Sequence, residues 1–200
     1  MNADRDTRRL ILKSARDLIY SRSYSEVGVA AICERAGIKK GSFYHFFPSK
    51  RDLTLAVIDE FFVELKQQIF EQAFATDLPP LQRLLRLVEL GYLFQKEIAQ
   101  TLGQTLGCPF GNLAAEMSTQ DEPIRQKVER VFEMMEGRLA ETLQAAEAHG
   151  DINDVDIPAT AQAMLAYIEG IMLMAKTRND PQVIRQLGPA MAEIRIRKTV

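Results

Sequence analysis

The sequence predicts an all-α protein, and three observations support this. Nearly every segment spaces its apolar residues three or four positions apart, which is the period of an amphipathic helix. No segment alternates apolar and polar residues as a half-buried strand does. Glycine and proline lie between the periodic segments, for example at Gly37, Pro48 and Pro79, where they end or begin helices.

The helices can be placed by their periodicity and their breaks. We predict helices over residues 6–20, 29–36, 40–46, 49–73, 81–95, 112–117, 122–148 and 156–176, and a terminal one from 180 onward. In the first, an apolar stripe is formed by Leu10, Ile11, Ala15, Leu18 and Ile19. Ser49 caps the long helix 49–73, which at 1.5 Å per residue spans about 35 Å, enough to couple two domains.

Charge is distributed unevenly along the chain. The net charge is −2, but residues 1–51 hold 11 Lys/Arg against 5 Asp/Glu, and residues 52–200 hold 14 against 22. A basic head on an acidic body is expected when only the head contacts phosphates. An accident of surface composition is the alternative, and charge alone does not decide between them.

Several classes of protein are disfavoured by the composition. Two cysteines cannot make a disulfide framework, so we expect a cytoplasmic protein. The start, MNADRDTRR, lacks the apolar core of a signal peptide. Residues 159–175 hold 13 apolar residues of 17, but the stretch is short and contains Glu169, so we expect no membrane partner. We expect no cofactor and no metal, because His45 has no potential ligand at metal-binding spacing.

A helix-turn-helix is predicted by the run VAAICERAGIKKGSFYHFFPSKRD, residues 29–52. Two short helices flank Gly37, with Ile38, Phe43 and Phe47 as core anchors. Side chains suited to phosphates or base edges remain on the second helix and beside it, namely Lys39, Lys40, Ser42, Tyr44, His45 and Lys50. Gly41 leaves room for close approach to the phosphate backbone.

The segment GIKKGSFYHFFPSKRDL resembles the recognition-helix signature of the TetR family of bacterial transcriptional regulators. The likeness covers residues 7–61 and includes the aromatic run, Pro48 and Lys50. It implies a homodimeric, all-helical repressor with a three-helix head that reads double-stranded operator DNA, residues 1–51, and a helical effector-sensing and dimerisation body, residues 52–200. By the likeness, the operator contacts are Ser25, Lys39, Ser42, Tyr44, His45 and Lys50.

Two helices near the C-terminal end of the sequence carry apolar residues outside a single amphipathic stripe. In the helix 159–176 apolar residues face almost every direction, so all sides need cover. We expect it to form a four-helix dimer interface with the helix 123–148. The alternative is a helix buried inside a monomer.

Cys108 is the candidate sensor. Pro109 suits the first helical position, which places Cys108 at the N-cap, where unpaired amides favour a thiolate. An inert packed cysteine is the alternative, and it is the reading we give to Cys33. The stretch GCPFGNLAAEM resembles a subset of TetR-like regulators that sense electrophiles and oxidants, including the N-ethylmaleimide-reductase regulators, in which a cysteine and a lysine at the positions of Cys108 and Lys176 form the reactive pair.

Reversible binding of a small molecule of unknown identity stays open as the other sensing mode. Its pocket would be lined by Tyr92, Phe94, Leu102, Leu113, Met117, Phe132 and Met172. Either event would move the helix 49–73 and misplace the reading heads.

Two other classes remain as alternatives. A small helical enzyme could use Cys108 as nucleophile, although the histidines that could serve as its base are at a predicted DNA surface and a helix end. An architectural DNA-binding protein would need no effector. We expect a regulator and not an enzyme.

Overall fold

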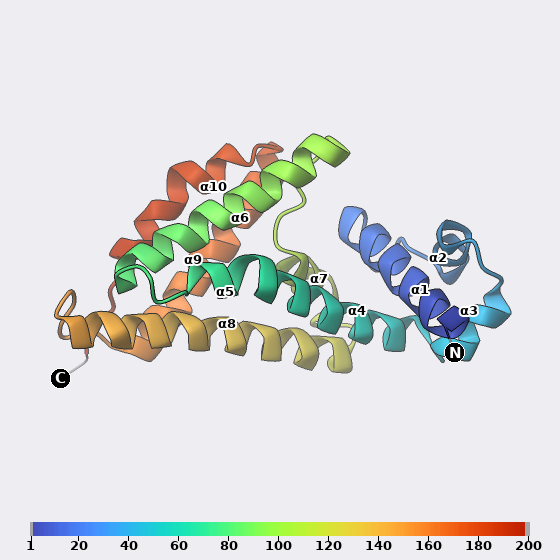
Figure 1. Cartoon of the computed structure of the whole chain (residues 1–200), viewed down its shortest axis with the longest axis horizontal. Coiled ribbons are helices and arrows are strands. Elements are labelled where there is room, and N and C mark those ends of the chain that lie inside the picture. Colours follow the sequence, from blue (N-terminus) through green and yellow to red (C-terminus); the bar gives the residue numbers. More distant parts are fainter. Residues whose placement is uncertain (1, 199–200) are drawn as a thin grey trace. The chain divides into compact units, whose positions relative to one another are not determined.

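The computed structural model describes residues 2–198 of the chain and is helical in all its regular elements, as predicted (Figure 1). The α-helices are α1 (Asn2–Ser21), α2 (Val29–Ala36), α3 (Lys40–Phe46), α4 (Lys50–Leu65), α5 (Glu71–Ala73), α6 (Pro80–Leu102), α7 (Pro109–Met117), α8 (Glu122–His149), α9 (Ile157–Arg178) and α10 (Gln182–Leu187). A π-helical segment spans Lys66–Phe70 and a 3-10 helix spans Gly188–Glu193. Within the described residues, extended pairing is limited to one isolated bridge between Val155 and Arg197.

The described chain divides into two compact units. The first unit comprises residues 1–64 and 109–129, and the second comprises residues 65–108 and 130–200. The helices α1–α4, α7 and the start of α8 therefore belong to the first unit. The functional division into 1–51 and 52–200 stays a prediction, because a compact unit is not the same thing as a functional domain.

The first unit is built around the long helix α1, the short helices α2 and α3, and α4 (Figure 1). Its buried apolar side chains include Ile11, Leu12, Ala15, Leu18, Ile19, Ile32, Phe43, Phe47, Leu53 and Val57. Leu10, which we placed on the buried stripe of the first helix, is 51% exposed, and Leu12 is buried in its place. Gly37 ends α2 with φ +66°, a left-handed conformation that glycine adopts without strain.

The predicted helix 49–73 is interrupted. Ser49 caps α4 as expected, because its Oγ accepts the amide N–H of Asp52 at 3.1 Å. The helix then passes into the π-helical segment at Lys66 before α5 resumes at Glu71. A π-helical turn accommodates an extra residue without breaking the run of backbone hydrogen bonds, which is why the apolar spacing along the sequence does not show it.

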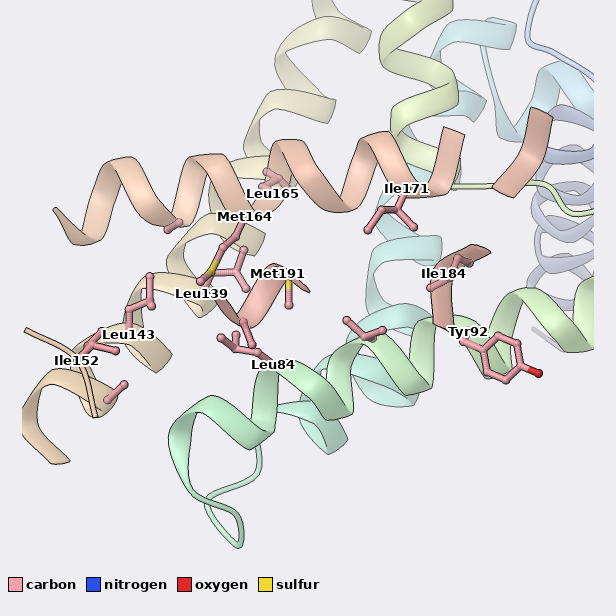
Figure 2. Close-up of a cluster of buried hydrophobic side chains, with 14 of the residues drawn as sticks. Leu84, Tyr92, Leu139, Leu143, Ile152, Met164, Leu165, Ile171, Ile184 and Met191 are labelled. Carbon is pink, nitrogen blue, oxygen red and sulfur yellow. The ribbon is translucent and has the colours of Figure 1, made fainter. Parts of the chain in front are cut away.

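The second unit has a core of apolar side chains from α6, α8, α9 and α10. Figure 2 shows Leu84, Leu143, Met164 and Ile184 among the side chains that meet there. Asp156 caps α9 by accepting the amide N–H of Ala159 at 3.0 Å. This core fixes the positions of α6 and α9, the two helices that flank Cys108 in the second unit.

Candidate nucleic-acid interface and candidate sensor site

The helix α3 separates one buried anchor from a polar outer surface. Phe43 is completely buried, whereas the adjacent Tyr44 is 53% exposed. All of the predicted contacts on and just before this helix lie at the surface, namely Lys39, Lys40, Gly41, Ser42, Tyr44 and His45. Ser25 is exposed as well. The arrangement leaves hydroxyl, imidazole and ammonium groups available to phosphates and base edges.

Gly41 has no packing partner that requires a glycine. A Cβ built on this residue would meet no atom of the chain within 4 Å, and the residue is exposed. Internal packing therefore does not explain the small residue at the start of α3. Its role in close approach to a phosphate backbone stays a prediction.

Lys50 tethers a loop in this structure. Its Nζ donates to the carbonyl oxygens of Tyr24, at 2.9 Å, and Val27, at 3.2 Å, and lies 3.9 Å from the centre of the Tyr24 ring. Burial lowers the pKa of Lys50, partly opposed by the nearby Glu116 carboxylate. The ammonium holds the loop before α2 against the start of α4, and a phosphate contact by Lys50 stays a prediction.

Glu116, on α7, anchors the same loop from the other direction. Its carboxylate accepts the amide N–H of Tyr24 at 2.8 Å and that of Ser25 at 2.7 Å. Burial acts to raise the pKa of Glu116, but these hydrogen bonds and the charge of Lys50 outweigh it, so the pKa lies below its ordinary value. The loop that leads into the helix-turn-helix is therefore held by a charged side chain from a helix far along the sequence.

A second carboxylate of this region binds the start of α4. The buried Asp121 accepts a hydrogen bond from Nε of Arg51 at 2.5 Å, and it also accepts the amide N–H of Ile124 at 3.2 Å in the first turn of α8. Glu116 and Asp121 both connect residues 109–129 to the helices of the same compact unit. Neither residue was predicted to have a role.

Gly107 and Cys108 end a segment that the second unit holds firmly. The side-chain amide of Gln95, on α6, donates to the carbonyl of Gly107 at 2.9 Å and accepts the amide N–H groups of Leu106, at 3.2 Å, and Gly107, at 3.0 Å. Asn179, the C-cap of α9, accepts the amide N–H of Thr105 at 2.7 Å. The backbone leading to Cys108 is thereby fixed from two helices.

Gly107 lies directly against α9. Its φ is +72°, and an added Cβ would come 3.1 Å from the carbonyl oxygen of Met172 and 3.4 Å from Cβ of Lys176. A larger residue would be strained at this φ, and the Met172 carbonyl would have to shift by a few tenths of an ångström to admit it. The structure thus brings the stem of Lys176 against the residue that precedes Cys108, and the pairing of Lys176 with Cys108 that the family resemblance implied stays a prediction.

Cys108 itself is half-buried and hydrogen-bonds to the carboxyl group of Glu169. α7 begins at the following residue, Pro109, which suits the first helical position as expected, whereas the apolar periodicity places the start of this helix at residue 112. Burial raises the pKa of Glu169, and the hydrogen bond with Cys108 partly offsets this effect. The Oε1 atom of Glu169 is buried and has no hydrogen-bond partner. Cys33, in contrast, is buried in the first unit, where burial raises its pKa.

The residues predicted to line a reversible pocket are divided between the two compact units. Leu113 and Met117 are buried in the first unit. The other five, Tyr92, Phe94, Leu102, Phe132 and Met172, belong to the second. Tyr92, Phe132 and Met172 are part of its apolar core or pack against it, and Leu102 is exposed. Most of these residues pack in or against an apolar core, and a role in effector binding stays a prediction.

Sequence reasoning missed Gln95, Glu116 and Asn179. Each acts through a side chain that hydrogen-bonds to backbone groups distant in the sequence, and no spacing rule reveals such a partner. Glu169 could have been identified from the sequence, because a single carboxylate within an apolar helix is costly to bury and therefore suggests a function.

Comparison with known proteins agrees with this architecture. The family described as "Bacterial regulatory proteins, tetR family" matches residues 11–57, and the one described as "Tetracyclin repressor-like, C-terminal domain" matches residues 80–191. The transcriptional regulator AcuR of Cereibacter sphaeroides is 33% identical over 177 residues, which cover 86% of this chain and 78% of that protein.

Two further relatives extend the comparison. An uncharacterised HTH-type transcriptional regulator of Lactococcus lactis is 32% identical over 182 residues, covering 90% of this chain and 88% of its own. The crystal structure of the regulatory protein TetR from Rhodobacter sphaeroides superposes with a TM-score of 0.82 at 29% identity, covering 94% of this chain and 98% of that one. The matched head and body together span most of the sequence, and the chain belongs to the TetR family of DNA-binding bacterial transcriptional regulators.

Proposed function

We propose that the protein is a homodimeric transcriptional repressor that leaves its operator when an electrophile modifies Cys108. The polar outer surface of α3 carries the DNA-binding part of the proposal, because it presents Ser42, Tyr44 and His45 from a helix anchored by the buried Phe43. Two such heads would enter successive major grooves about 34–36 Å apart. Binding, and not turnover, is the activity we propose.

The dimer is supported by apolar surface that the chain leaves open. Along α9, Ala166, Gly170 and Leu173 lie on one exposed stripe, and Leu173 is 63% exposed. On α8, Met134 is exposed as well. Among residues 2–198, α9 alone is long and apolar enough to cross a membrane, but core helices of soluble proteins pass the same test. We infer that a second copy covers this stripe, since TetR-like bodies carry the dimer contacts in the resemblance described above.

Covalent sensing is favoured over a reversible pocket by what surrounds Cys108. The cysteine is half-buried, its preceding backbone is fixed by Gln95, and the stem of Lys176 lies against Gly107. The NemR repressor of Escherichia coli is a more distant relative, 24% identical over 178 residues. Because the backbone around this half-buried cysteine is held by hydrogen bonds, a group added to the sulfur must displace its surroundings.

The chain supplies a direct route from Cys108 to the head. Cys108 is bonded to Pro109, the first residue of α7, and two helical turns later Glu116 holds the loop before α2. We propose that modification of Cys108 shifts the start of α7 and loosens this hold. The helix-turn-helix would then lose its fixed orientation. A modification that acts in this way must favour the released state over the DNA-bound state.

An electrophoretic shift assay on DNA from upstream of the protein's own gene tests the proposed function. We expect binding to weaken steeply with salt, because each phosphate contact releases counterions, by about 10³-fold or more between 50 and 200 mM for six or more contacts. N-ethylmaleimide should release the complex. A salt-independent affinity would contradict the DNA surface, and a complex indifferent to the electrophile would contradict the sensing mode.

Glu116→Gln should weaken the hydrogen bonds that hold the loop before α2 against α7. Because the folded pKa is depressed, the carboxylate stabilises the fold above its unfolded pKa of about 4.3, and this contribution is lost as the pH falls through the lower folded value. We expect the variant to lose about 1–3 kcal/mol of unfolding free energy at pH 7 in urea titrations, and the difference from the parent to vanish at low pH. Operator affinity should fall as well.

The control for this change is Glu26→Gln, an exposed carboxylate in the same loop. It should leave both unfolding and operator affinity unchanged. If Glu116→Gln matches this control at pH 7, then Glu116 does not anchor the loop and the proposed route through α7 fails.

A further inference from the structure

One face of α9 carries two charged groups beside Cys108. Glu169 and Lys176 are seven residues apart on the helix, so they lie on the same face two turns apart. The Gly107–Cys108 backbone runs along this face, with Cys108 hydrogen-bonded to the Glu169 carboxyl and Gly107 against the Lys176 stem. The thiol therefore contacts a carboxyl group, and the residue before it contacts the stem of a lysine on the same helix.

The Glu169 carboxyl is unusual in its surroundings. It projects from a helix in which no other acidic residue occurs, and its Oε1 atom is buried without a hydrogen-bond partner. Burying a carboxyl group in this way costs free energy, and packing alone would be served as well by an apolar residue. A buried carboxyl in contact with a nucleophilic sulfur suits proton transfer, because burial brings its proton affinity closer to that of a thiol.

We propose that Glu169 is the proton acceptor that activates Cys108 toward electrophilic alkenes, an inference that rests on the proposed sensing function. The Glu169 carboxylate takes the thiol proton as the sulfur lone pair forms a C–S bond to the β-carbon of an alkene conjugated to a carbonyl. The π electrons move to the α-carbon, which then receives the proton from Glu169. The carboxylate is regenerated, and the product is a thioether at Cys108.

This assignment predicts whether removal of the Glu169 carboxylate slows or accelerates the alkylation of Cys108. A carboxylate that merely accepted the thiol hydrogen bond would hold the proton on sulfur and slow alkylation, so its removal would accelerate the reaction. A proton acceptor has the opposite effect. Cys108 is the titratable group that contacts Glu169, and Lys176 lies two turns further along the same helix. Burial raises the pKa of Glu169, so its carboxylate forms at higher pH than that of an exposed glutamate.

The test is the rate of Cys108 alkylation by N-ethylmaleimide between pH 5 and 9, read by peptide mass spectrometry, which distinguishes Cys108 from Cys33. In the unaltered protein we expect the rate to rise as Glu169 ionises and to flatten once that ionisation is complete. In Glu169→Gln we expect a loss on the order of hundredfold or more at pH 7 and a rate that follows thiolate formation up to pH 9. Glu169→Asp should retain part of the rate, and Glu193→Gln, an exposed carboxylate, should retain all of it.

The outcomes separate the two proposals. If Cys108 is alkylated at the same rate, or faster, in Glu169→Gln with an unchanged pH profile, Glu169 is not the proton acceptor, while the sensing function stands. If Cys108 is not alkylated in the unaltered protein, both proposals fail. Should Glu169→Gln not fold, the pH profile of the unaltered protein decides, because a rate that tracks thiolate formation alone overturns the assignment.

Discussion

Tyr44→Ala is expected to weaken operator binding by roughly tenfold to hundredfold, which corresponds to the 1–3 kcal/mol of one good contact in a protein–DNA interface. Tyr44 is exposed on α3, and its ring packs edge-on against the buried Phe43, with the ring centres 5.2 Å apart. This contact holds the phenol on a rigid base, so its hydroxyl can reach a phosphate at little cost in side-chain entropy. A shift assay at fixed salt measures the effect.

The variant must lose binding without losing the fold. Since Tyr44 is exposed, we expect its unfolding free energy to change by less than about 1 kcal/mol and its sedimentation to remain that of the parent. Tyr44→Phe isolates the hydroxyl, and Leu85→Ala, an exposed apolar residue of the second unit, is the matched control for surface truncation. Unchanged affinity in Tyr44→Ala, or dissociation of the dimer, would refute the proposed DNA surface.

The features predicted most accurately from the sequence are the helix ends that nearby glycine and proline residues determine. The limits of α2 and α3 coincide with those predicted, because Gly37 supplies the left-handed cap and Pro48 prevents α3 from continuing. The π-helical segment at Lys66 was not predictable, since it keeps the apolar spacing of the helix it interrupts. Leu10 was misplaced because an amphipathic stripe read from sequence has an uncertain edge, and tertiary packing chose Leu12.

The candidate site was predictable only in part. Spacing and residue type identified the exposed face of α3 and placed Cys108 directly before a helix that begins with Pro109. They could not identify Gln95 or Glu116, whose partners are backbone amides 12 and 92 residues away. Such contacts depend on how helices pack in three dimensions. They also hold the segment before Cys108 and the loop before α2 in place, so the proposed means of regulation is less visible in the sequence than the proposed DNA-binding surface.

Cys108→Ser is expected to abolish release of the operator complex by N-ethylmaleimide while leaving operator affinity unchanged in its absence. A serine hydroxyl can donate the hydrogen bond that the thiol makes to Glu169, so the local structure should be kept. The hydroxyl is a far weaker nucleophile than a thiol, so no adduct should form. The measurement is the fraction of DNA bound after treatment, compared with intact-protein mass.

Cys33→Ser provides the matched control, because Cys33 is buried in the first unit and burial raises its pKa, so it should react slowly. The Cys33→Ser protein should release DNA like the parent and gain the mass of one maleimide. Release that persists in Cys108→Ser would mean that the electrophile acts elsewhere, and Cys108 would then be a packing residue. Release lost in both variants would indicate that both thiols take part, and would contradict sensing by Cys108 alone.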